Sequence, residues 1–172
     1  MKIEGVRILN KQIHHDSRGY FSNLWNQQDV NLTSLKQINL SMNTKAGTIR
    51  GLHYQVYPHE DCKVVICLRG AIFDVLTDLR PGSHTFGRTM SIELTEDSTE
   101  IVFVPKLVAH GFQTLVDETY VMYLHSGIYN KTSERGIHPL DKTLAIPWKL
   151  PPSVISDRDL NLQSFQEFVA DL

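Results

Sequence analysis

The chain has 172 residues, of which 41% are hydrophobic, and this suits one domain with a single core. Its formal net charge of -2 excludes the basic excess that is usual in nucleic-acid-binding proteins. No apolar run has the length of a membrane span, and the N-terminal MKIEGVRILNKQ lacks the apolar core of a signal peptide. We therefore expect one domain over residues 1–172, located in the cytoplasm, without nucleic-acid or membrane partners.

Short strands separated by turn residues are predicted along the chain. Within one of them, Asp74 and Asp78 fall on the same face. Cys62 and Cys67 are expected to point to opposite faces of another strand, which disfavours a disulfide between them. The predicted strands are CKVVICL (62–68), AIFDVLTDL (71–79), RTMSIEL (88–94), EIVFV (100–104), FQTL (112–115) and TYVMYLHS (119–126).

Helical signals are few. A weak one lies near Gln27 to Leu35, and a second covers Asn161 to Leu172, where apolar residues recur at helical spacing. Many short strands with one short C-terminal helix favour an all-β fold, a jelly-roll barrel of the cupin type. Such a barrel encloses a pocket between its sheets, where inward side chains can do chemistry.

RGLHYQ at residues 50–55 contains the first residue suited to proton transfer. The neutral imidazole of His53 could take up a proton near physiological pH, as a general base does. The alternative is a core histidine bonded to the backbone. Its place between Arg50 and Gln55, in a run suited to a strand, favours the functional interpretation.

Lys63 lies in the apolar run DCKVVICL. Burying an ammonium group is costly unless it meets an anion, so an inward-facing Lys63 would suit an enolate oxygen. An outward-facing lysine would simply be solvated. The alternation of the run does not decide between the two.

Four other side chains each allow a functional and a purely structural interpretation. Tyr129 is either a general acid at the pocket mouth or an aromatic residue packed on the barrel rim. Asp159 is either the carboxylate that orients His53 or the N-cap of the C-terminal helix. Arg18 and Arg50 have the planar fork that matches phosphate oxygens, although either could be an ordinary surface arginine.

A metal site is not predicted. A cupin site usually has two histidines one residue apart, whereas here the pair would be His53 and Gln55, and Lys63 lies where a carboxylate is expected. His14 and His15 are adjacent, so a strand would point them apart. No glycine-rich phosphate loop and no Ser-His-Asp or Cys-His pattern is found. We therefore expect neither a metal nor a cofactor.

Motifs in a fixed order give nearly the whole chain a family resemblance. Together they resemble the nucleotide-sugar 4-keto-6-deoxyhexose epimerases, typified by dTDP-4-dehydrorhamnose 3,5-epimerase. The motifs are DSRGYF (16–21), NLS (39–41), RGLHYQ (50–55), the lysine of CKVV, FDVLTDLRPGSHTFG (73–87), VPKLVAHGF (104–112), YLHSGIYN (123–130), ERGIHPLD (134–141) and ISDRD (155–159).

The resemblance implies a metal-free cupin barrel that acts as a homodimer on a nucleotide-diphosphate sugar. His53 falls on the family's catalytic base, with Asp159 as its partner. Lys63 falls on the lysine that stabilises an enolate, and Tyr129 on the acid that returns a proton from the other face. The reaction implied is inversion at C3, C5 or both. The residues implied in substrate binding are Arg18, Phe21, Asn23, Gln37, Asn39, Arg50 and His110.

Two positions depart from the family pattern. Asn23 stands where a glutamate is usual, and its amide can donate as well as accept a hydrogen bond. We hypothesise that base preference is relaxed or shifted toward cytosine, so the substrate carries either dTDP or CDP. Asp61 stands where a glutamine is frequent, and a further carboxylate near a diphosphate is unexpected.

Two other functions fit the same barrel. A nucleotide-sugar 3,4-ketoisomerase would use the same enolisation with a different proton destination. A non-catalytic cupin that binds sugar nucleotides would use only the pocket. Tyr129 favours an epimerase over a ketoisomerase, because inversion needs an acid across the ring. The set His53, Lys63, Tyr129 and Asp159 favours an enzyme, because a binding protein needs no base and acid.

Overall fold

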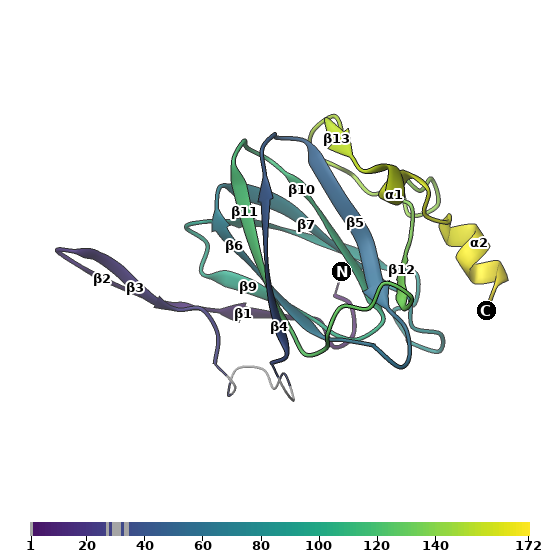
Figure 1. Ribbon diagram of the computed structural model, residues 1–172, viewed down its shortest axis with the longest axis horizontal. Helices are drawn as coiled ribbons and strands as arrows, with labels where there is room; N and C mark the ends of the chain where they lie inside the picture. Colours follow the sequence, from purple (N-terminus) through teal and green to yellow (C-terminus); the bar gives the residue numbers. More distant parts are fainter. Residues whose placement is uncertain (1, 27, 29–31, 33–34) are drawn as a thin grey trace.

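Two β-sheets pack face to face to form a barrel (Figure 1). The computed structural model describes residues 2–26, 28, 32 and 35–172. The first sheet has the order β1 (Arg7–Asn10), β9 (Glu100–Val104), β6 (Lys63–Arg69), β11 (Thr119–His125) and β4 (Gln37–Asn43). The second has the order β12 (Glu134–Gly136), β5 (Thr48–Gln55), β10 (Val108–Thr114), β7 (Ala71–Asp78) and β8 (Thr89–Thr95), and β13 (Val154–Ile155) also pairs with β5.

A separate two-stranded hairpin projects from the barrel. Its strands are β2 (Gln12–Asp16) and β3 (Gly19–Asn23), which pair with each other in a sheet of their own. Figure 1 shows this hairpin, called the arm below, extending well away from both sheets.

The all-β prediction is confirmed, with strand ends that differ by one residue at most in five cases. The predicted strands at 62–68, 71–79, 88–94, 100–104 and 119–126 correspond to β6, β7, β8, β9 and β11. The strand predicted at 112–115 instead begins at Val108, because β10 is held along its length between β5 and β7. His110 and Gly111 interrupt the apolar pattern there, so the sequence did not predict the first half of the strand.

The predicted C-terminal helix over 161–172 is wrong in extent. Two shorter helices replace it, α1 (Asp157–Leu160) and α2 (Phe165–Ala170). Ser164 begins α2 through a capping box with Glu167, in which each side chain bonds the other's backbone N–H. The helix predicted near Gln27 to Leu35 lies largely outside the described residues.

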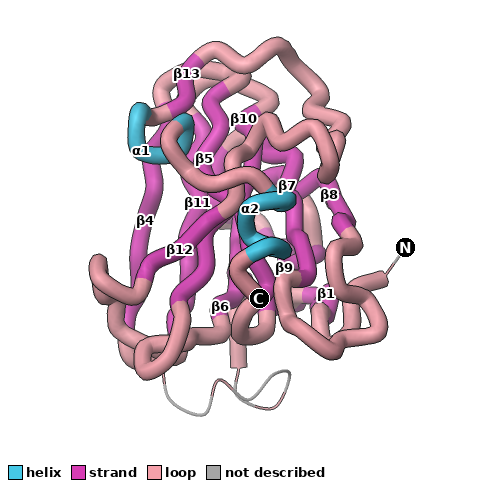
Figure 2. Tube along the Cα trace, turned by 90° about the vertical axis from the view of Figure 1, so that its right-hand side faces the viewer, coloured by secondary structure: helices cyan, strands magenta, loops and turns pink. Residues whose placement is uncertain are grey.

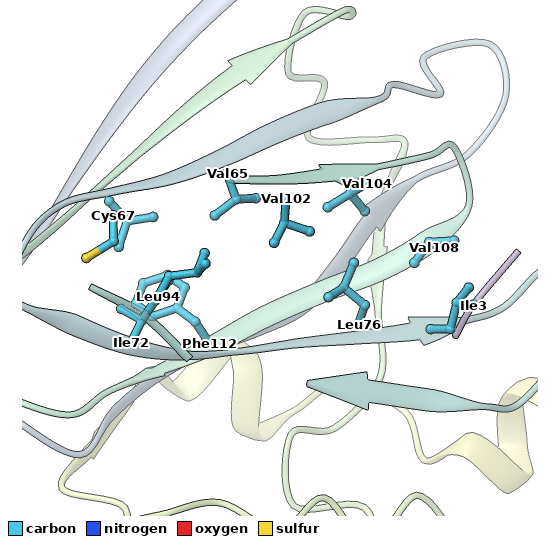
Figure 3. Packing of buried hydrophobic residues seen from close by; sticks show 11 residues of the cluster. Ile3, Val65, Cys67, Ile72, Leu76, Leu94, Val102, Val104, Val108 and Phe112 are labelled. Atoms are coloured by element: carbon cyan, nitrogen blue, oxygen red, sulfur yellow. The ribbon is translucent and has the colours of Figure 1, made fainter. Parts of the chain in front are cut away.

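Alternation along the strands builds the core between the sheets (Figure 3). In β6, Val65 and Cys67 face this core, whereas Val64 and Ile66 belong to a cluster on the outer face. Cys62 and Cys67 are free cysteines. The C-terminal segment covers the outer face of the second sheet with apolar side chains, including those of Trp148 and Phe165, and Figure 2 shows α2 lying on that side.

Polar side chains interrupt the apolar inner face. Lys63 shares the inward face of β6 with Val65, and Asp74 lies between the core residues Ile72 and Leu76 on the inward face of β7. Lys63 also lines the cavity between the sheets. Among the described residues, no helix is long and apolar enough to cross a membrane.

Candidate active site

A cavity of about 850 Å³ opens between the two sheets. Side chains from β4, β5, β6, β10 and β11 line it, together with residues around α1 and the loop after β11. This volume falls in the range of small-molecule sites. Four residues predicted to be catalytic, His53, Lys63, Tyr129 and Asp159, all line this one cavity although they are distant in sequence.

A β-bulge brings Arg50 and His53 to the same wall. The two residues are three apart, so regular alternation would place them on opposite faces. Against β10, however, His53 pairs with His110 and Arg50 with Phe112, so β5 has one residue more than its partner. Gly51 makes the bulge possible, because its φ is 115° and a Cβ there would lie 2.5 Å from the Cα of Gly111.

His53 is held by Asp159. Its Nε2 lies 2.8 Å from Oδ1 of Asp159, whose other oxygen accepts the backbone N–H of Gly51 at 3.1 Å. Asp159 is 2% exposed. Burial raises the pKa of Asp159, but His53 and the Gly51 N–H outweigh it and lower the pKa to about 2. The carboxylate therefore stays charged and fixes the imidazole ring, with Nε2 as the donor.

Asp159 reaches His53 because the chain returns alongside β5. The parallel pairing of β13 with β5 leads directly into α1. The N-cap of α1 is Ser156, whose side chain accepts the N–H of Asp159 at 3.2 Å. Asp159 therefore lies inside the first turn, and the alternative reading of it as an N-cap is wrong.

Lys63 faces inward and is 9% exposed. Its Nζ lies 3.4 Å from the backbone oxygen of His53. Burial lowers the pKa of Lys63, and the charges of Asp61 and Asp74 oppose that effect. An outward, solvated position is therefore wrong for this lysine, and its ammonium lies beside the proposed base.

His110 also faces the pocket and pairs with Asp74. Its Nε2 lies 2.6 Å from Oδ1 of Asp74, and both side chains are buried. Burial lowers the pKa of His110, which favours the neutral ring. His110 in turn meets the ring of Tyr123 edge-on at 6.0 Å between centroids.

Tyr129 stands at the edge of the pocket and is 48% exposed. Its hydroxyl donates to Oε2 of Glu134 at 3.1 Å. Burial and the Glu134 carboxylate raise the pKa of Tyr129, so the resting phenol keeps its proton.

Arg158 connects the surroundings of Tyr129 and His53. Its Nη1 donates to the same Glu134 oxygen at 2.9 Å, and its Nε donates to Asp159 at 3.2 Å. Its Nη2 lies 3.2 Å from Nε2 of His53. The guanidinium of Arg158 therefore contacts both Glu134, which bonds to Tyr129, and Asp159, which bonds to His53.

Substrate-binding predictions divide between two places. Arg50, Asn39 and His110 line the cavity, and Gln37 bonds to Asn39 beside it. Arg50 Nε donates to Oδ1 of Asn43 at 2.7 Å, which holds the guanidinium in place.

The remaining predicted binding residues, Arg18, Phe21 and Asn23, belong to the arm and do not line the cavity. Arg18 pairs with Asp16 at 2.6 Å, and its side chain is 87% exposed. Phe21 is 72% exposed. Within one chain, the structure does not bring these three residues to the pocket.

Several pocket residues were missed from the sequence. Arg158 is adjacent to Asp159 in ISDRD, and Glu134 opens ERGIHPLD, so both lay in recognised motifs without a role. Asp61 was noted only as a departure, and its partner His125 lay in the motif YLHSGIYN without a role. Across the described ranges, no group of three or more His, Cys, Asp or Glu side chains could hold a metal ion.

Comparisons with known proteins agree on one family. The model of the family described as dTDP-4-dehydrorhamnose 3,5-epimerase matches residues 1–167. A protein of that name from Shigella flexneri is 36% identical over 169 residues, covering 95% of this chain and 93% of the relative.

Solved structures are similar over nearly the whole chain. The dTDP-4-dehydrorhamnose 3,5-epimerase of Bacillus anthracis, with TDP and PPi bound, has a TM-score of 0.89 and 36% identity, covering 95% of this chain and 99% of that one. A Legionella pneumophila epimerase in complex with dTDP-4-keto-L-rhamnose has a TM-score of 0.91 and 31% identity, covering 99% and 93%.

Proposed function

This chain belongs to the dTDP-4-dehydrorhamnose 3,5-epimerase family, and we propose that His53, Lys63, Tyr129 and Asp159 carry out its reaction. The protein is an isomerase that inverts C3, C5 or both in a nucleotide-diphospho-4-keto-6-deoxyhexose. The observation that carries the residue assignment is the convergence of a paired histidine, a buried lysine and a protonated tyrosine on one cavity.

Proton removal is assigned to His53. The C4 ketone acidifies the hydrogens on C3 and C5, and the imidazole takes one of them. Since Nε2 donates to Asp159, Nδ1 is the nitrogen that accepts the proton. The C–H electron pair becomes the C=C bond of an enolate, and Asp159 stabilises the imidazolium that forms.

Stabilisation of the enolate is assigned to Lys63. Negative charge moves to the C4 oxygen, and a buried ammonium already in place counters it without reorganisation. Burial strengthens this interaction because little water screens it.

Delivery of the second proton is assigned to Tyr129. Its hydroxyl transfers the proton to carbon from the face opposite the base, and a phenolate remains. Arg158 lies beside this tyrosine and offsets the new negative charge, whereas Glu134 keeps the hydroxyl protonated before reaction. Inversion, rather than a ketone shift, follows from having this separate acid.

The substrate is proposed to be a dTDP sugar held by residues from both the pocket and the arm. Support comes from the dTDP and TDP ligands of the similar structures and from Arg50 and Asn39 at the cavity. A CDP sugar remains the alternative predicted from Asn23. The two free cysteines fit the proposed cytoplasmic location.

A homodimer is proposed as the working state, with residues 1–172 as one domain in each subunit. The arm of one subunit would then carry Arg18 and Phe21 to the pocket of the other. Edge strand β4 supports this proposal, because it exposes apolar side chains at alternate positions. These are Ile38, Leu40 and Met42.

Proton NMR of the protein with dTDP-4-keto-6-deoxyglucose in heavy water tests the function, and the CDP analogue is measured separately. We expect the C3 or C5 signal to disappear while diastereomer peaks grow, and the lost signal names the inverted centre. Movement of the ketone from C4 to C3 would indicate a ketoisomerase. Absence of exchange with both sugars would contradict the proposal.

A further inference from the structure

Asp61 and His125 form a pair in the pocket that the proposed reaction does not use. Oδ2 of Asp61 lies 2.7 Å from Nδ1 of His125, and both residues line the cavity. Asp61 is 8% exposed, and Gln55 contacts its other oxygen at 3.4 Å. A buried carboxylate needs such partners, so its role follows from what it holds.

The protonation of Asp61 sets the tautomer of His125. Burial raises the pKa of Asp61, but the hydrogen bond from His125 and the charge of Lys63 outweigh it, and the pKa lies below its ordinary value. A charged carboxylate only accepts, so Nδ1 of His125 is the donor. In the neutral ring, Nε2 is then an acceptor.

A hydrogen-bonded chain runs from this acceptor to the Tyr129 backbone. Nδ2 of Asn39 lies 3.5 Å from Nε2 of His125, and Oδ1 of Asn39 accepts from Nε2 of Gln37 at 2.9 Å. Oε1 of Gln37 accepts the backbone N–H of Tyr129 at 2.9 Å. Every link donates in the same direction, from Tyr129 toward Asp61, so each amide has one favoured orientation.

We propose that Asp61 and His125 are positioning residues for Tyr129, acting through Asn39 and Gln37. The proposal rests on the proposed function, in which Tyr129 delivers the second proton. Tyr129 lies beyond the end of β11 and is about half exposed, so packing constrains it less than the buried core. This hydrogen-bonded chain ties its backbone to strand β4 and, through His125, to the buried carboxylate of Asp61.

This arrangement separates two steps of the reaction. His53 is not part of this series of hydrogen bonds and is held by Asp159 instead. Proton removal should therefore not depend on His125. Breaking the hydrogen bonds between His125 and Tyr129 should therefore slow inversion more than proton exchange. Asp61 is a less selective place to test this, because its charge also acts on Lys63.

Two substitutions of His125 divide its roles. His125→Gln keeps an amide oxygen near the place of Nε2, as an acceptor for Asn39. His125→Asn keeps only a donor near the place of Nδ1. We expect the ratio of inversion to exchange to fall about five- to tenfold in His125→Asn, the effect of one lost hydrogen bond, and to stay near wild type in His125→Gln. His84→Asn, at an exposed turn, is the matched control.

Both rates come from one proton NMR time course in heavy water, where exchange removes a signal and inversion creates a diastereomer peak. A wild-type ratio in His125→Asn, or an equal fall of both rates, would overturn the proposal. If the wild type neither exchanges nor inverts, the proposed function fails instead. The backbone amide signal of Tyr129 then decides the positioning alone: a shift in His125→Asn but not in His125→Gln supports it, and an unchanged signal rejects it.

Discussion

The barrel pocket and the arm hold their polar residues in opposite ways. In the pocket, His53 bonds to Asp159, which is 106 residues away, and the backbone N–H of Tyr129 bonds to Gln37, which is 92 residues away. In the arm, Arg18 bonds to Asp16, two residues away, and its side chain is 87% exposed. Contacts distant in sequence thus build the pocket, whereas the arm is built locally.

This difference determines which proposed functions a single chain can complete. A base, an enolate-stabilising cation and an acid require fixed mutual positions. The barrel holds the residues proposed for these roles at one cavity. Among the described residues, the arm pairs with neither sheet of the barrel, so we expect its side chains to act against another surface. The proposed chemistry therefore belongs to the single barrel, and part of nucleotide binding belongs to the proposed dimer.

Replacing the base should produce the largest effect. We expect His53→Ala to lower solvent exchange at C3 and C5 by about 10³-fold, within the range for a lost general base. Affinity for dTDP should change little, because His53 is proposed only to move a proton. Proton NMR in heavy water and a calorimetric titration with dTDP measure the two quantities. Turnover near the wild-type rate would contradict the assignment.

Replacing the acid should separate the two half-reactions. In Tyr129→Phe the base remains, so we expect exchange to continue while inversion falls about 10²-fold. Tyr57→Phe, at an exposed turn outside the cavity, gives a matched control for loss of a hydroxyl. Inversion at the wild-type rate would mean that another group delivers the proton.

Strand positions were predictable where local sequence was sufficient. EIVFV became β9 with the predicted ends, because β-branched residues between turn signals need no distant information. His110 and Gly111 were missed as strand residues, because their pairing with β5 and β7 fixes them there. Local pattern likewise overextended the final helix, where Ser164 begins a new one.

The four residues predicted to be catalytic could be placed in one group from the sequence, but the geometry that brings them to one cavity could not be predicted. Family motifs named His53 and Lys63, but the bulge that turns Arg50 and His53 to one wall arises from pairing with β10. Asp61 and His125 are 64 residues apart, so the sequence around either residue does not predict that they pair. Likewise, the motif containing Arg18 does not tell whether it serves its own pocket or a second one.

Acidification should weaken the barrel pair without a comparable effect in the arm. The folded pKa of Asp159 is about 2, below the ordinary 3.8, so its contribution is complete above about pH 4 and is lost as pH falls toward 2. We expect Asp159→Asn to cost about 2 kcal/mol at pH 6 and progressively less below pH 4. Urea unfolding at both pH values measures this.

The control for that experiment is Asp16→Asn. The pKa of Asp16 is also lowered, by Arg18, but the group is fully exposed on the arm. We expect no measurable change in unfolding at either pH. Equal losses in Asp16→Asn and Asp159→Asn would remove the distinction between arm and barrel.

Mixing two variants tests whether the arm serves another subunit. Arg18→Ala should lower kcat/KM about tenfold, because a charged hydrogen bond to phosphate is lost. Substrate that does bind should still exchange its protons with solvent. A mixed dimer of Arg18→Ala with His53→Ala would contain one pocket with both wild-type residues. We therefore expect activity at low substrate to exceed the sum of the separate proteins. Simple additivity after subunit exchange would show that each arm serves its own chain, or none.

The smallest effect is expected from the base-reading position of the arm. Asn23 can donate and accept, whereas a glutamate there only accepts, which suits N3–H of thymine better than cytosine. We expect Asn23→Glu to raise the preference for dTDP over CDP by about fivefold, the value of one hydrogen bond, and to leave kcat unchanged. Asn10→Glu, on β1 of the barrel, is the control. Competition titrations with dTDP and CDP measure the preference directly. A change in kcat would mean that the arm acts on the chemistry, and an unchanged preference would mean that position 23 does not meet the base.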